Sequence, residues 1–216
     1  DMRALASRAP ETTLIPGTEI TTFQGHANVL GLLEPLDFQL GGDRLPDLDS
    51  LLDEVERRGA LISVNHPALP TGAACMGCGW NADTDWSRID AIEVINGGLL
   101  REGTEEGPWS GVPFWENLLD QGYRLTAIGG SDNHDPADTS GAQSPIGAPQ
   151  TAVRAASRSV RDILDGVRSG DVFIDMGRSA DRVFRLEFEQ DGQTMAMGGE
   201  LRLAAGQPIA GSLVTT

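Results

Sequence analysis

The order of hydrophobic and polar residues divides the first 175 positions into short apolar runs and longer amphipathic segments. The runs that we expect to form strands cover residues 12–22, 25–32, 60–67, 90–98, 125–130, 150–155 and 171–175, and the expected helices cover 47–58, 114–121 and 159–168. The run at 60–67 is apolar almost throughout, which fits a strand buried on both faces of a sheet. Because strands and helices alternate, the pattern predicts a mostly parallel α/β sheet or barrel.

The segment 47–58 shows how the helices are delimited. Its leucines and Val55 recur at helical spacing on one face. Asp47 or Asp49 provides an N-cap, and Gly59 stops the helix because glycine readily adopts the left-handed conformation that ends one.

The pattern changes after residue 182. Apolar and polar residues alternate over 183–189, 201–203 and 209–214 with no helical segment between them, which predicts antiparallel strands. We therefore expect one α/β domain over residues 1–180 and a β appendage, or the start of a β domain, over 181–216.

Charge excludes several kinds of chemistry. The net charge is −16, and all 16 basic residues are arginines. With no lysine, the chain can form neither a Schiff base nor a phosphate-loop contact through lysine. A clustered basic face for nucleic acid is not expected, and no run approaches the length of a membrane span. An anionic small molecule stays possible if bound cations reverse the local field.

The two cysteines, Cys75 and Cys78, lie in a long loop at 68–88. A structural zinc site needs four ligands and usually two such pairs, and the sequence has no second pair. The spacing therefore favours a dithiol or disulfide in a surface loop. Loops of this length are usually lids or binding loops, so we expect this one, with Trp80 and Trp86, to cover the mouth of the barrel.

Candidate chemistry is concentrated in Gly129-Gly130-Ser131-Asp132-Asn133-His134-Asp135, which follows the apolar run at 125–128. Glycines after a strand let the backbone turn sharply. Asp132 and His134 are two residues apart, so on extended backbone they project to the same side. A carboxylate and an imidazole at the end of a strand suit a divalent metal.

The three histidines, His26, His66 and His134, all lie where a predicted strand begins or ends. Ligands in α/β sheets and barrels bind beyond the carboxyl ends of strands. Two interpretations stay open, since the histidines are either metal ligands or hydrogen-bonded core residues. Glu19 is open in the same way, because it is either buried beside a metal or faces water on an edge strand.

Several segments together resemble the PHP (polymerase and histidinol phosphatase) superfamily, and in particular its CehA/McbA-type metallohydrolase branch. They are Ile15–Thr21 (IPGTEIT), Gly25–Gly31 (GHANVLG), Asn65–Pro67 (NHP), Asp90–Gly98, Gly130–His134 (GSDNH) and Ile146–Thr151 (IGAPQT). The resemblance covers roughly residues 12–176 and implies a distorted (β/α)7 barrel with two or three divalent metals, Zn, Mn or Fe, at its mouth.

The resemblance also implies roles for individual residues. Glu19 would bridge two metals, and His26 and His66 would complete one of them. Asp132 would bind the second metal, and His134 would belong to a third. Such a cluster generates hydroxide from bound water, so Glu19, Asp132 and His134 are the implied catalytic residues.

One departure from the family pattern affects the expected fold. The family opens with a His-x-His motif and then a Thr-Asp-His-type motif, and this chain has neither. We therefore expect an incomplete barrel from a longer protein. The function expected is a metal-dependent hydrolase of small, anionic phosphoesters, with carbamates or carboxylic esters as rivals. The alternative is a truncated metal- or ligand-binding module without catalysis.

Overall fold

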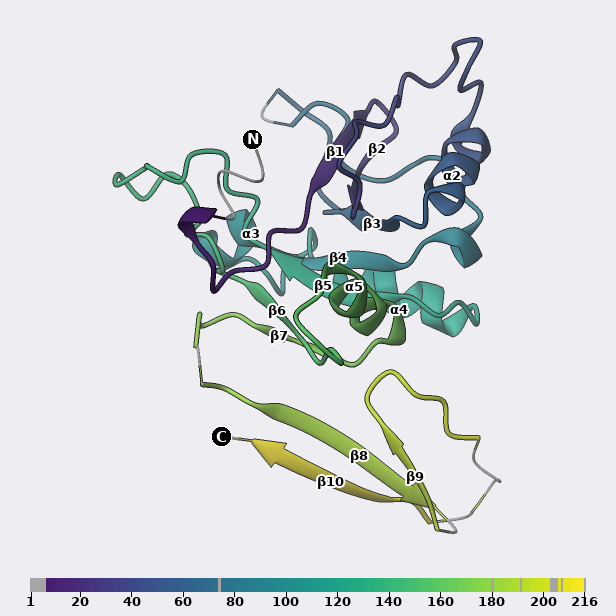
Figure 1. The fold of residues 1–216 in the computed structure, drawn as a ribbon, viewed down its shortest axis with the longest axis vertical. Helices are drawn as coiled ribbons and strands as arrows, with labels where there is room; N and C mark the ends of the chain where they lie inside the picture. The colour runs from purple at the N-terminus through teal and green to yellow at the C-terminus, as the bar shows by residue number, and fades with distance from the viewer. Residues whose placement is uncertain are drawn as a thin grey trace.

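The computed structural model describes residues 7–73, 75–179, 181–190, 192–202, 206 and 208–215. Its main feature is a five-stranded sheet of order β1-β2-β3-β4-β5 (Figure 1). The strands are β1 (Gly17–Thr22), β2 (Gly25–Leu30), β3 (Leu61–Asn65), β4 (Ala91–Asn96) and β5 (Thr126–Gly130). The α/β class predicted from the sequence is therefore confirmed.

The direction of the strands departs from the mostly parallel sheet that the pattern predicts. β2 is antiparallel to both of its neighbours, β1 and β3, while β3, β4 and β5 run parallel. Phe23 and Gln24 alone join β1 to β2, and so short a connection turns the chain straight back. Within the described residues the sheet is open, with β1 and β5 at its two edges, and no closed barrel forms.

Helices cover both faces of this sheet. They are α2 (Leu48–Arg57), α3 (Gly97–Glu102), α4 (Val112–Asp120) and α5 (Val160–Ser169), with a short 3₁₀ helix at Trp86–Arg88. Ile62 of β3 packs in the core with α2 and α4, whereas its neighbour Leu61 packs with Leu164 of α5. Successive strand residues point to opposite faces, so β3 is buried on both sides as its apolar sequence predicts.

Side-chain caps account for where α2 and α3 begin. Asp47 accepts a hydrogen bond from the amide of Ser50 at 2.9 Å and so caps α2. The sequence predicts a strand through Gly98, but β4 ends at Asn96 and α3 begins directly after it. The Asn96 side chain accepts from the amide of Gly98 at 2.8 Å, and this N-cap converts the two glycines from strand to helix.

A two-stranded antiparallel sheet, β6 (Gln150–Val153) and β7 (Val172–Asp175), lies against β5. The hydroxyl of Thr151 accepts from the amide of Gly129 and donates to its carbonyl, each at 2.9 Å. A Cβ on Gly129 would crowd Ile174 and Pro149, so glycine is required for this close approach.

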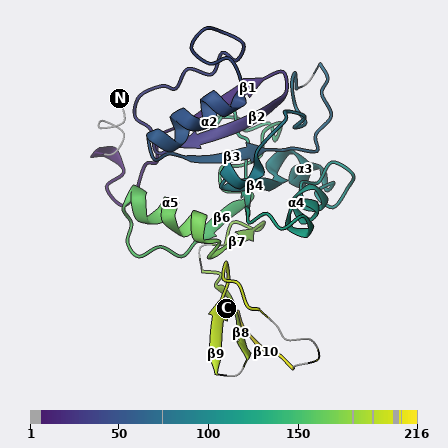
Figure 2. The same ribbon diagram turned by 90° about the vertical axis from the view of Figure 1, so that its right-hand side faces the viewer.

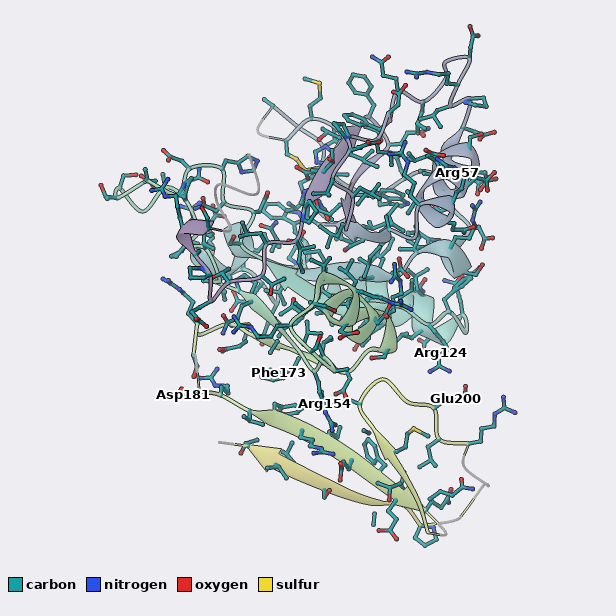
Figure 3. All side chains as sticks on the ribbon, viewed as in Figure 1. Arg57, Arg124, Arg154, Phe173, Asp181 and Glu200 are labelled. Carbon is teal, nitrogen blue, oxygen red and sulfur yellow. A yellow bond between two sulfur atoms is a disulfide. The ribbon has the colours of Figure 1, made fainter. Side chains whose placement is uncertain are left out.

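The C-terminal part forms a separate three-stranded sheet of order β10-β8-β9, which lies below the rest in Figures 1 and 2. Its strands are β8 (Phe184–Gln190), β9 (Gln193–Ala196) and β10 (Ala210–Thr215). Figure 3 shows Arg124 on the main body and Glu200 on the C-terminal part facing each other. The two residues form an ion pair with a nitrogen–oxygen distance of 2.9 Å.

The alternation at 183–189 and 209–214 corresponds to β8 and β10, but β9 is not predicted by the sequence. Residues 201 and 202 form no strand, and residue 203 of that predicted segment lies outside the described residues. None of the helices in the described ranges has the length and apolarity needed to cross a membrane.

Candidate metal-binding site

The β1–β2 hairpin places Glu19 and His26 on one face of the sheet. Thr21 pairs directly with His26, and Glu19, two residues from Thr21, shares its face. His26 Nδ1 lies 3.6 Å from Glu19 Oε1. Asn65, opposite His26 on β3, donates to the same oxygen at 3.0 Å. The carboxylate is therefore held in place by its neighbour on the central strand.

His66 brings a second imidazole to Glu19. It follows β3 directly, has the unusual backbone angle φ = 28°, and is buried. Its Nε2 lies 3.9 Å from Glu19 Oε1, and its ring centroid lies 5.2 Å from that of His26. Distances of 3.6 and 3.9 Å are too long for hydrogen bonds, but two ligands at about 2.1 Å in a tetrahedral metal site lie about 3.4 Å apart.

Glu93 is a buried carboxylate behind His66. Its Oε2 accepts from the backbone amide of His66 at 2.8 Å. Burial, together with smaller contributions from the negative charges of Asp132 and Glu19, raises the pKa of Glu93 to about 8. Three acidic groups thus act on one another in a largely buried space, which a bound cation would neutralise. The residues present therefore fit a divalent metal.

Asp132 joins this group through Asn96. The Asn96 side-chain amide donates to Asp132 Oδ2 at 3.2 Å and lies 3.4 Å from Glu93 Oε1. Asp132 has a left-handed backbone, φ = 50°, and lies two residues after Gly130, which ends β5. Burial lowers the pKa of His66, and the carboxylates of Asp132 and Glu19 oppose this shift. Asp132 therefore lies within electrostatic range of His66.

His134 stands apart from the buried group. Its side chain is 70% exposed, and its Nδ1 lies 2.9 Å from the carbonyl oxygen of Asp132 and 3.8 Å from Oδ1 of the same residue. Of the five predicted site residues, the structure brings His26 and His66 to Glu19. Asp132 is connected to this group through Asn96 and Glu93. His134 lies beside Asp132 with its ring exposed.

The cysteine loop lies directly against the site. Cys75 and Cys78 form a disulfide, which is one of the two states that their spacing favours, but Cys78 is buried rather than on the surface. Its sulfur lies 3.5 Å from His66 Nδ1, and the Met76 carbonyl lies 3.0 Å from His26 Nε2. Ligand atoms of His26, His66, Cys75 and Cys78 all lie within 4.8 Å of one another.

Sequence reasoning missed three contributors, Glu93, Asn96 and the cysteine pair. Glu93 carried a usable signal, because it interrupts an apolar strand in the same way that Glu19 does. Asn96 gave no such signal, because asparagine is a common residue at the end of a strand. The sequence has no second cysteine pair beside Cys75 and Cys78, but in the structure His26 and His66 lie next to them.

Comparison with protein-family models finds no match, and comparison with curated proteins finds none either. Among solved structures, the chain is similar to a two-domain protein from Bacteroides vulgatus ATCC 8482 described as containing a predicted PHP-like metal-dependent phosphoesterase. The two are 19% identical with a TM-score of 0.55, over 99% of this chain and 68% of that one. At this identity, the likeness shows that the two share a fold.

Proposed function

We propose that the protein is a metal-dependent hydrolase of phosphoesters or related small, anionic esters. The observation that carries the proposal is the approach of two imidazole nitrogens, from His26 and His66, to one oxygen of Glu19 at 3.6 and 3.9 Å. The PHP-like description of the similar Bacteroides structure supports the same kind of chemistry. A closed structural site would bury every ligand, whereas Glu19 is 34% exposed and leaves room for water.

The proposed roles follow the placement of each side chain. Glu19 would contribute to two ion sites, His26 and His66 would complete the first, and Asp132 would serve the second. His134, at the exposed rim, serves a third ion or a substrate group. Two or three Zn, Mn or Fe ions are proposed, and when bound they supply activated water and neutralise the ester oxygens.

Other residues of the chain hold these groups in position. Asn65 fixes Glu19, and Asn96 links Glu93 to Asp132. Glu93 accepts a hydrogen bond from the backbone amide of His66 and so fixes the backbone at this position. The fixed backbone in turn orients the imidazole ring of His66. We also propose that the open sheet corresponds to part of a distorted (β/α)7 barrel of PHP type over residues 1–180, with residues 181–216 as a β appendage.

The proposal is tested with a panel of an aryl phosphate monoester, a phosphodiester, a carboxylic ester and a carbamate. We expect turnover of at least one to be lost on chelation and restored by added Zn²⁺ or Mn²⁺. Glu19→Ala and His66→Ala should each lower turnover by roughly 100-fold or more. Glu200→Ala, which removes an exposed carboxylate from the C-terminal part, is the matched control and should retain activity. Turnover that survives both chelation and His66→Ala would refute the proposal.

A second candidate is a metal-binding module without catalysis. It is favoured by the position of His134, whose ring is 70% exposed and does not join the buried group. It predicts one bound metal or fewer by elemental analysis, and no turnover of any member of the panel. Two or three bound metals would count against it.

A further inference from the structure

We propose that Cys75 and Cys78, as a dithiol, form a zinc site with His26 and His66, and that closing the disulfide releases the two histidines to the Glu19 site. The zinc site stands on its own geometry. Its regulatory consequence rests on the proposed function, because only then does freeing the histidines switch on a hydrolase.

The four side chains match a common zinc ligand set. Two cysteines in Cys-x-x-Cys spacing with two histidines form the Cys₂His₂ centre found in many structural zinc sites. A sulfur and a nitrogen bound to the same tetrahedral zinc lie about 3.6 Å apart, and Cys78 Sγ lies 3.5 Å from His66 Nδ1. All four ligand atoms lie within 4.8 Å of one another, so small movements suffice to close around an ion.

Each histidine turns one ring nitrogen to Glu19 and the other to the cysteine loop. His66 turns Nε2 to Glu19 and Nδ1 to Cys78. His26 turns Nδ1 to Glu19 and Nε2 to the Met76 carbonyl in the cysteine loop. A neutral imidazole has one nitrogen with a free lone pair and one that carries hydrogen, so it binds one metal at a time. The two sites therefore compete for the same pair of rings.

The cysteine loop is held against the hairpin by backbone contacts as well as by the disulfide. Gly77, between the cysteines, has φ = 82°, and a Cβ at this position would collide with the Thr22 carbonyl. After the loop, the amide of Asn81 donates to the carbonyl of Gln24 at 2.8 Å. These contacts do not involve sulfur, so opening the disulfide leaves both thiols beside the histidines.

The redox step balances with a small dithiol as reductant. The dithiol gives two electrons and two protons to the Cys75–Cys78 disulfide and is itself oxidised to a disulfide. The sulfur–sulfur bond of the protein breaks, and two thiols form. On binding Zn²⁺ the two thiols lose their protons to solvent, which leaves two thiolates and two neutral imidazoles around the ion.

The test compares oxidised and dithiol-reduced protein titrated with Co²⁺ and Zn²⁺, with the reductant removed before metal is added. In the reduced protein we expect thiolate-to-cobalt charge-transfer absorption, protection of both cysteines from a thiol reagent by one equivalent of Zn²⁺, and zinc binding at least about 100-fold tighter than in the oxidised protein. Reduced protein that binds Co²⁺ without thiolate absorption, or that binds Zn²⁺ no more tightly than oxidised protein, overturns the proposal.

Variants separate this site from the proposed hydrolase site. Glu19→Gln should retain the thiolate spectrum of the reduced protein, and the Cys75→Ser/Cys78→Ser double variant should lose it. Met76→Ala, in the same loop, is the matched control and should behave as wild type. If the double variant lowers stability, the comparison of reduced with oxidised wild type still decides the question, since it needs no substitution.

The regulatory consequence has its own readout. Zinc-loaded reduced protein should hydrolyse its substrate at least about tenfold more slowly than oxidised protein, and the double variant should be insensitive to reductant. A thiolate spectrum without Glu19-dependent metal binding in the oxidised protein would refute the proposed function and leave the zinc site standing. Equal rates in both redox states would overturn the switch.

Discussion

Glu93→Gln tests whether, with no metal bound, the ionised form of Glu93 destabilises the folded protein. In the folded chain the pKa of Glu93 is raised by burial to about 8, from 4.5. The folded state therefore keeps a proton that the unfolded chain loses above pH 4.5, and stability falls as the pH rises from 4.5 towards 8. At pH 7, some 2.5 pH units into this window, the penalty is about 3 kcal/mol. Glutamine cannot ionise, and it keeps an acceptor for the amide of His66.

The measurement is urea denaturation followed by circular dichroism, in a chelator, at pH 5, 6, 7 and 8. The pKa of His66 is lowered by burial, so its contribution to stability is lost as the pH falls through 6.5 and opposes the Glu93 trend. Both proteins contain His66, so subtracting their curves cancels this contribution. The stability of Glu93→Gln relative to wild type should rise by about 1.4 kcal/mol per pH unit between pH 5 and 7.

A control and a metal arm complete the experiment. Glu200→Gln, on an exposed carboxylate, should give a flat difference curve over the same range. Added Zn²⁺ should shrink the advantage of Glu93→Gln, because a cation stabilises the ionised carboxylate. Parallel curves for wild type and Glu93→Gln in chelator would refute the reasoning.

Three further predictions concern stability. Asp47→Ala removes the cap of α2 and should cost about 1 kcal/mol, seen as a lower thermal midpoint, whereas Asp47→Asn should lose much less. Leu52→Ala opens a cavity at a fully buried position and should cost about 2–5 kcal/mol in urea denaturation; a loss below 1 kcal/mol would contradict this packing. Arg124→Ala breaks an exposed ion pair with Glu200 and should change stability by less than about 1 kcal/mol, a loss that salt should reduce further.

Much of the fold can be predicted from the sequence because buried positions are occupied by apolar residues at regular spacing. β3, β5 and α2 all lie inside the predicted segments, since apolar runs, helical spacing and caps act over a few residues. Strand direction is less local. The two-residue gap between β1 and β2 was a readable hairpin signal, but the antiparallel pairing of β2 with β3 depends on how a 30-residue connection folds back.

The site shows the same division between local and distant information. Glu19 stands out in the sequence because it interrupts a predicted strand, and His26, His66 and Asp132 stand out because they lie near strand ends. Burying such polar groups costs free energy unless they are paired or bind a ligand. The contact between Cys78 and His66 depends on a long loop returning over the hairpin, and the spacing of two cysteines does not encode that path. α3 was missed because Asn96 caps two glycines that otherwise favour a turn.

The edge position of β1 has a consequence for how the protein holds metal. Glu19 lies on this outermost strand, whereas His66 follows the inner strand β3 and Glu93 lies on the inner strand β4. An ion bound by both Glu19 and His66 would link the edge strand β1 to the central strand β3. Amide hydrogens of β1 should then exchange with solvent more slowly when metal is present. The rate of ion release would be limited by the local opening of the β1–β2 hairpin.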